Sequence, residues 1–137
     1  EVRILTAYSN GDPLAEIHAV MSREQLLSMR KEAEAVYVHP LMAGYLADIA
    51  GATRRQERVV TGVSPRGTLA LMRCCKALAC MEGRDYVIPD DVKALAPCVL
   101  AHRLVFSSGR SRQEDAVRLM EDILKSIPVP VEDFSGR

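Results

Sequence analysis

Aromatic residues are scarce in this sequence, which has no tryptophan, two phenylalanines and four tyrosines among its 137 residues. Alanine, leucine, valine and methionine carry the apolar content instead, and this composition favours packed helices over sheets. A chain of this length can bury a core as one domain. The composition therefore favours an all-α domain.

An excess of charge of either sign is also absent, because 18 lysines and arginines balance 18 aspartates and glutamates. No overall field attracts nucleic acid or an anionic membrane, so we expect no nucleic-acid partner. No apolar run is long enough to span a bilayer and no signal-peptide pattern opens the chain, so we expect no membrane insertion. The immediate start at Glu1 is compatible with a segment cut from a longer protein.

Cysteines are few, and none of the four shows a paired C-x-x-C spacing. Three of them, Cys74, Cys75 and Cys80, lie in one predicted helix. A zinc site or a disulfide framework is therefore not expected, and we predict no metal ligands. Reduced thiols acting as small apolar residues fit this pattern, and they indicate a cytoplasmic location.

The signatures of a complete enzyme are missing. There is no G-x-x-x-x-G-K-[ST] phosphate loop and no apolar strand that ends in Asp-Glu. These parts hold a nucleoside triphosphate and its magnesium, so the chain alone should not hydrolyse ATP. Three histidines, His18, His39 and His102, are far apart in sequence and nothing supports a catalytic pairing among them; His102 fits a hydrogen-bonded packing role.

Helix start and stop signals, in contrast, occur along the whole chain. Capping patterns and apolar periodicity predict helices over residues 1–8, 23–35, from 40 into 53–58, and over 62–81, 89–95, 98–105 and 113–126. Pro97 should separate two of these helices, and residues 14–21 should be an extended connector lying on the helices. The sequence predicts a small helical bundle over residues 1–130, with at most a very short extended segment at 36–38, and a flexible tail at 131–137.

The helix predicted over 62–81 has the clearest start. Ser64 is an N-cap candidate, Pro65 suits the first helical position, and Arg66 follows. A cation is unfavourable at a helix N-terminus by ~0.3–1 kcal/mol, whereas amides and a guanidinium together suit phosphate oxygens. Arg66 is therefore a candidate phosphate contact, with a surface arginine that happens to follow proline as the alternative. The inward stripe is expected at Leu69, Met72 or Arg73, the Lys76 stem, Ala77 and Cys80, broadened by Leu71, Cys75 and Leu78.

Three segments occur in an order that resembles the C-terminal lid domain of MoxR-family AAA+ ATPases. They are Gly62-Val-Ser-Pro-Arg-Gly-Thr-Leu-Ala-Leu71, Gly83-Arg-Asp-Tyr-Val-Ile-Pro-Asp-Asp-Val-Lys-Ala-Leu-Ala-Pro97 and Leu100-Ala-His-Arg-Leu104. Val36-Tyr-Val38, Thr53-Arg54 and Pro128-Val-Pro130 are also similar to that family. The sequence departs from the family pattern at Gly67, where alanine is expected, and at Ile88, which stands in an N-cap slot that Asp91 can partly compensate.

The resemblance implies that Arg66 is the sensor-2 arginine, which reaches the γ-phosphate of ATP on a neighbouring core domain, with Ser64 and Pro65 beside the nucleotide. It implies ATP and Mg²⁺ bound mainly by that absent core, with no cofactor expected for this chain by itself. The expected partners are the chain's own AAA+ core, identical subunits in a hexameric ring, and proteins with von Willebrand factor A domains. The function implied is to couple ATP binding and hydrolysis to chaperone-like remodelling or maturation of partner proteins.

Two alternative functions stay open at this point. The chain could be a stand-alone helical protein-interaction module without a nucleotide role, or the lid of a magnesium-chelatase-like AAA+ subunit. For Arg54, Arg55 and Arg58 we weigh dipole matching at a helix end against contacts to a core domain or a neighbouring subunit. We interpret Arg84 and Asp85 as a turn with a local ion pair, and Arg103 as a residue that caps or pairs inside the bundle.

Overall fold

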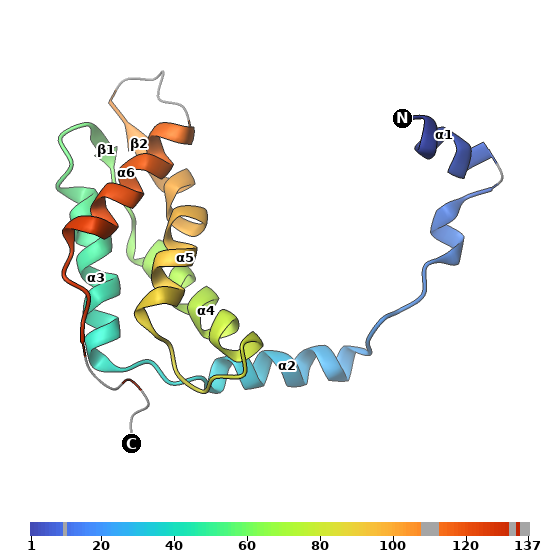
Figure 1. Ribbon diagram of the computed structural model, residues 1–137, viewed down its shortest axis with the longest axis horizontal. Helices are drawn as coiled ribbons and strands as arrows, with labels where there is room; N and C mark the ends of the chain where they lie inside the picture. Colours follow the sequence, from blue (N-terminus) through green and yellow to red (C-terminus); the bar gives the residue numbers. More distant parts are fainter. Residues whose placement is uncertain (10, 108–112, 132–133, 135–137) are drawn as a thin grey trace.

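The computed structural model describes residues 1–9, 11–107, 113–131 and 134. In this part of the chain the helices are α1 (Val2–Ser9), α2 (Arg23–Ala35), α3 (Pro40–Arg54), α4 (Pro65–Met81), α5 (Pro89–Leu100) and α6 (Gln113–Ser126), as Figure 1 shows. Short 3-10 turns form at Pro13–Glu16 and Ala101–Arg103, and two strands, β1 (Val59–Thr61) and β2 (Val105–Phe106), pair antiparallel. The predicted all-α class is confirmed.

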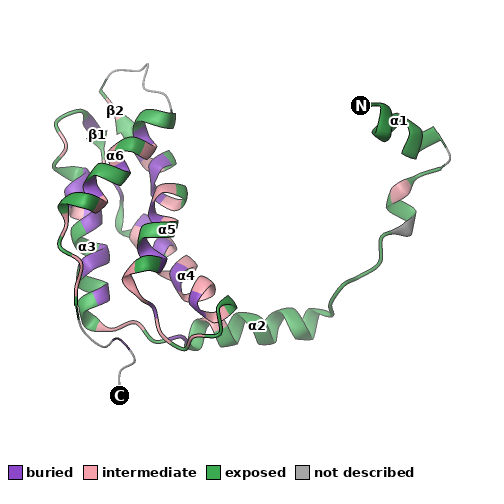
Figure 2. Ribbon diagram, viewed as in Figure 1, coloured by how far each residue is buried: buried purple, intermediate pink, exposed green. Residues whose placement is uncertain are grey.

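The core lies between α3, α4, α5 and α6. Buried residues gather on the inner faces of these four helices, whereas α1 and α2 contain no buried residue (Figure 2). The wholly buried side chains with the largest volumes include Met42, Ile49, Leu71, Leu100 and Met120. Burying a side chain of this size contributes roughly 1.5–3 kcal/mol. The packed bundle therefore holds the N-terminal ends of its helices in fixed positions.

Helix α4 faces the core with a different stripe from the predicted one. Its buried residues are Gly67, Leu71, Cys75 and Ala79, which recur every four positions. Leu69, which was expected to lead the inward stripe, is 49% exposed. Leu71 and Cys75 were expected only to broaden that stripe. The apolar residues on α4 cover so much of its circumference that periodicity alone does not select the buried side.

Two short extended segments link parts of the chain that are distant in sequence. The β1–β2 ribbon joins the loop before α4 to the segment after α5, where a polar loop and helix were expected. The extended segment expected at residues 36–38 forms an isolated parallel bridge between Tyr37 and Tyr86. Tyr37 donates its amide to the Asp85 carbonyl, and its own carbonyl accepts from the Val87 amide. The end of α2 is thereby attached to the α4–α5 turn.

Helix α5 continues through Pro97 to Leu100, so the prediction of two helices separated at this proline is wrong. An interior proline removes a backbone hydrogen bond and costs about 3 kcal/mol. Here Ala96 and Leu100 on the same helix are buried at 0% and 1% exposure. Their packing against the core holds the helix together. The chain then tightens into the Ala101–Arg103 turn.

Residues 1–9 and 11–22 lie away from the bundle, and α2 leads from them to it (Figure 1). The prediction that residues 14–21 lie on the helices is wrong, because Ile17 is 69% and Val20 94% exposed. Helix α2 has its predicted capping box between Ser22 and Gln25. Its larger apolar side chains, Leu26, Leu27 and Met29, are nevertheless 39–52% exposed, although the C-terminal half of α2 contacts α4. Leu41 in α3, which was expected to face inward, is exposed too.

The expected tail lies largely outside the described residues, because residues 132–133 and 135–137 are not described. The same holds for residues 108–112, which include most of the loop predicted before α6. Phe134 is described, and its ring lies edge-on to His39 with the ring centres 5.9 Å apart. A division at residue 130 stays a proposal.

Candidate functional site

The start of α4 has the local structure that its sequence predicts. Ser64 is the N-cap, its Oγ accepts a hydrogen bond from the Gly67 amide at 3.3 Å, and Pro65 occupies the first helical position. Arg66 follows with an exposed side chain, and no described residue forms a hydrogen bond or ion pair with its guanidinium. Ser64, Pro65 and Arg66 are thus together at a solvent-facing helix start. Their contact with a nucleotide stays a prediction.

A buried clamp attaches this helix start to the end of α3. Thr53, at 0% exposure, accepts a hydrogen bond from the Val63 amide at 2.9 Å and donates to the Ala50 carbonyl at 2.7 Å. Arg54 donates its Nε to the Val63 carbonyl at 3.0 Å. Both backbone groups of the residue before the N-cap are therefore held by α3. Gly62 permits this approach, because a Cβ there would lie 2.8 Å from Arg54 Cγ.

Arg103 packs directly against the first turn of α4. A Cβ at Gly67 would lie 3.2 Å from Arg103 Cδ and 2.9 Å from Val63 Cγ1. Arg103 also donates its Nε to the Val99 carbonyl at 3.0 Å, which satisfies a carbonyl near the end of α5. The expected capping role of Arg103 is thus confirmed. Gly67, which in the sequence was only a departure from the family pattern, is a point of close packing under the candidate site.

The arginines around this helix start serve two different purposes. Arg54 and Arg103 use their Nε donors on backbone carbonyls and so help to build the site. Arg66 is left with all its donors available to an external group. Pro65 has no N–H and Ser64 occupies the Gly67 amide, so the Arg66 guanidinium is the main donor that this end of α4 offers. A guanidinium suits bidentate binding of phosphate or carboxylate oxygens.

A second fixed point lies at the other end of α4. Gly83 has φ +73°, a left-handed conformation that ends the helix as predicted. Arg84 then binds the buried Asp91 through two hydrogen bonds of 2.9 and 2.6 Å, and it also pairs with Glu82. The hydrogen bond to Asp91 raises the pKa of Arg84 above its usual value. Asp91 accepts the Ile88 amide at 2.9 Å as well, which is the expected compensation for the apolar N-cap.

The cysteines lie in the core or at its edge, apart from Cys98, which is exposed. Burial raises the pKa of the Cys75 thiol to about 12, so this thiol stays protonated at neutral pH. His102 makes the expected hydrogen bond, with the Cys98 carbonyl, but it is exposed and so does not pack in the core. Over the described ranges we find no group of three or more potential metal ligands. The helices of the same part of the chain are too short or too polar to cross a membrane.

A four-helix bundle with a short ribbon, which holds an exposed arginine at a clamped helix start, has the architecture of a helical lid domain. A family model of the AAA lid domain matches residues 51–124. The chain belongs to this family. The matched region includes the clamp, Arg66 and Arg103.

Known proteins with similar sequences are much longer than the region that matches. The chain is 32% identical over 138 residues to the uncharacterized protein YeaC of Bacillus subtilis, covering all of this chain and 43% of YeaC. It is 30% identical over 133 residues to chaperone MoxR1 of Mycobacterium tuberculosis, covering 90% of this chain and 35% of MoxR1.

A crystal structure shares the fold. A candidate ATPase from Cytophaga hutchinsonii superposes with a TM-score of 0.78 at 24% identity, over 95% of this chain and 42% of that one. The chain therefore spans less than half the length of these proteins. The resemblance to the MoxR family lid is confirmed.

Proposed function

We propose that this chain is the sensor-2 lid of a MoxR-type AAA+ ATPase, in which Arg66 contacts the γ-phosphate of ATP bound with Mg²⁺ on a core domain. One observation carries the proposal: the Arg66 guanidinium is exposed and unpaired among the described residues, at a helix start that is otherwise fixed on both sides. An arginine without a specific role would not require the Thr53 and Arg54 hydrogen bonds that fix the start of its helix. Membership of the AAA lid family supports the same role.

The chemical contribution of Arg66 would be electrostatic. Phosphoryl transfer spreads negative charge over the γ-phosphate oxygens, and a positioned guanidinium stabilises that charge. The Thr53 and Arg54 hydrogen bonds to Val63 transmit any movement of the α4 start to α3. Loss of the γ-phosphate would release Arg66, and the bundle could then rotate as one body.

The same proposal extends to the assembly of the whole protein. A core domain would lie against the α4 start, identical subunits would form a hexameric ring, and lid rotation would act on neighbouring subunits. The output would be chaperone-like remodelling or maturation of partner proteins, including proteins with von Willebrand factor A domains. The similarity to a protein named chaperone MoxR1 supports this direction.

The test is an Arg66→Ala substitution in the ATPase that contains this chain. We expect kcat for ATP hydrolysis to fall at least ~10-fold, with partial recovery in Arg66→Lys, because charge stabilisation in the transition state is lost. Arg118→Ala, which removes another exposed arginine from α6, is the matched control and should leave turnover unchanged. Turnover of Arg66→Ala within about twofold of wild type refutes the sensor role. Phosphate release by the purified 137-residue chain alone would show that catalytic parts lie within it.

A further inference from the structure

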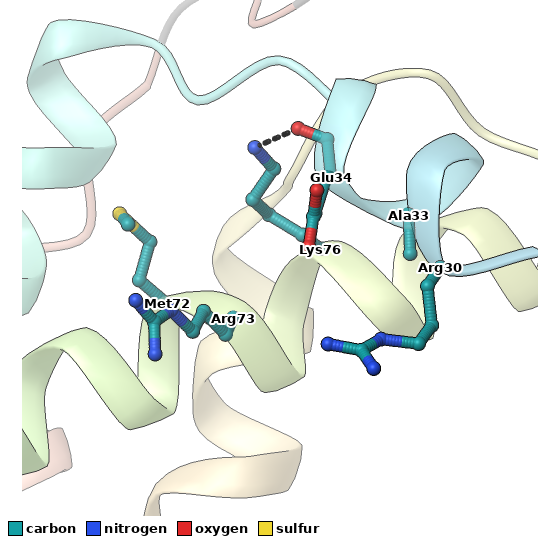
Figure 3. A pocket seen from close by; sticks show the side chains of 6 residues that line it. All are labelled: Arg30, Ala33, Glu34, Met72, Arg73 and Lys76. Carbon is teal, nitrogen blue, oxygen red and sulfur yellow. Dashed lines mark hydrogen bonds between the residues drawn. The ribbon is translucent and has the colours of Figure 1, made fainter. Parts of the chain in front are cut away.

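A hollow of about 520 Å³ lies where α2 meets α4. It is lined by Arg30, Ala33, Glu34, Met72, Arg73 and Lys76, whose side chains Figure 3 shows around it. Three cations and one carboxylate thus share one small surface, although the protein as a whole has no net charge. This local excess of positive charge is separate from the candidate site at Arg66, which is not among the lining residues.

The three cations differ in how they are held. Lys76 donates its Nζ to the Glu34 carbonyl, and this bond ties α4 to the end of α2 (Figure 3). Arg30 and Arg73 form no hydrogen bond or ion pair with any described residue. Each guanidinium carries five N–H donors. Two arginines on facing helices are therefore available to an anionic group from outside the chain.

The surroundings favour a carboxylate over a phosphate. Residues 72–76 are in the middle of α4, so their amides are used within the helix. Residues 30–34 are in the last half of α2, where the negative end of the helix dipole and the Glu34 carboxylate oppose a doubly charged phosphate more strongly than a singly charged carboxylate. Phosphate sites typically include free backbone amides at a helix N-terminus, and the residues that line this hollow provide no such amides. Met72 lines the hollow, and Leu69, one turn earlier on α4, is 49% exposed. An apolar border of this kind suits a polypeptide.

We propose that this hollow docks an acidic segment of a partner protein. Two carboxylates of that segment pair with Arg30 and Arg73, and its apolar side chains cover Met72 and Leu69. Opposite charges on the two surfaces give the contact its selectivity and its sensitivity to salt. The inference uses none of the residues assigned to nucleotide sensing, so either proposal can fail without the other.

The experiment measures binding of a fluorescein-labelled 16-residue peptide built from glutamate and leucine, by fluorescence anisotropy with the 137-residue chain. A second peptide has glutamine in place of every glutamate. We expect the glutamate peptide to bind, the glutamine peptide to bind at least ~10-fold more weakly, and the affinity to fall between roughly 50 and 300 mM salt. The variant Arg30→Glu/Arg73→Glu should weaken binding of the glutamate peptide at least ~10-fold.

The matched control is Arg3→Glu/Arg118→Glu, which makes the same change in net charge at two exposed arginines on α1 and α6. It should bind the peptide as the unmodified chain does, and circular dichroism of both double variants checks their folding. The proposal is overturned if the glutamate peptide does not bind, if both double variants lose binding equally, or if the glutamine peptide binds as well. Displacement of the peptide by pyrophosphate at equal concentration would identify a phosphate site instead.

Discussion

Gly67→Ala tests the packing under the candidate site most directly, because two effects of opposite sign compete there. In an open helix the change would stabilise the protein by up to about 1 kcal/mol, since alanine has the higher helix propensity. At this position the new Cβ would lie 2.9 Å from Val63 Cγ1, whereas unstrained carbon contacts are about 3.5–4.0 Å. Val63 is 0% exposed and both its backbone groups are clamped to α3, so it cannot retreat. Overpacking of this kind costs about 1–3 kcal/mol.

The net expectation for Gly67→Ala is a loss of roughly 1–2 kcal/mol in the free energy of unfolding. Urea unfolding of the 137-residue chain, followed by circular dichroism, measures it. Gly44→Ala is the matched control, because Gly44 is also in a helix but a Cβ there would meet nothing within 4 Å. That substitution should stabilise the chain by about 0.5–1 kcal/mol. The reasoning is refuted if both substitutions stabilise, or if adding Val63→Ala gives no compensation for Gly67→Ala.

Two further substitutions test the far end of α4 and its buried face. Arg84→Ala leaves the carboxylate of Asp91, 3% exposed, without its bidentate partner. The same unfolding assay should show the free energy of unfolding falling by about 3 kcal/mol. A fall below about 1 kcal/mol would contradict a stabilising buried ion pair between Arg84 and Asp91. The pKa of the Cys75 thiol is raised from 9.0 to about 12 by burial, so the unfolded chain releases this proton first and stability should fall as pH rises from about 9 toward 12. The Cys75→Ala variant should lose less stability than the unmodified chain over this pH range. If the unfolding free energies of the two proteins fall in parallel with pH, the raised pKa of Cys75 is contradicted.

The start of α4 was predictable because its signals are local. Ser64 and Pro65 act on the first turn of the helix that they precede, and no distant residue is needed to place them. The clamp that fixes this start was not predictable. Thr53 and Val63 are ten positions apart, and a threonine near a helix end followed by a glycine-containing loop has no characteristic spacing. The Thr53-Arg54 pair was visible only as part of a resemblance.

Helix α5 shows a different limit of prediction from sequence. Pro97 is a strong local signal for a helix end, yet α5 continues to Leu100. Tertiary packing of Ala96 and Leu100 outweighs a local preference of about 3 kcal/mol. Ile88 shows the reverse case, because the compensation by Asp91 three positions later is a local pattern and was predicted.

The orientation of α4 follows from its charges more than from its apolar residues. Rotating the helix to bury Leu69, now 49% exposed, would gain only about 1 kcal/mol. The same rotation would carry Arg73, and with it Lys76, toward the core, and an unpaired buried charge costs several kcal/mol. The stripe of Gly67, Leu71, Cys75 and Ala79 therefore faces inward. With that stripe buried, Arg66 at the helix start and Arg73 at mid-helix are both left in solvent, which is the condition that both proposed contacts with external anionic groups require.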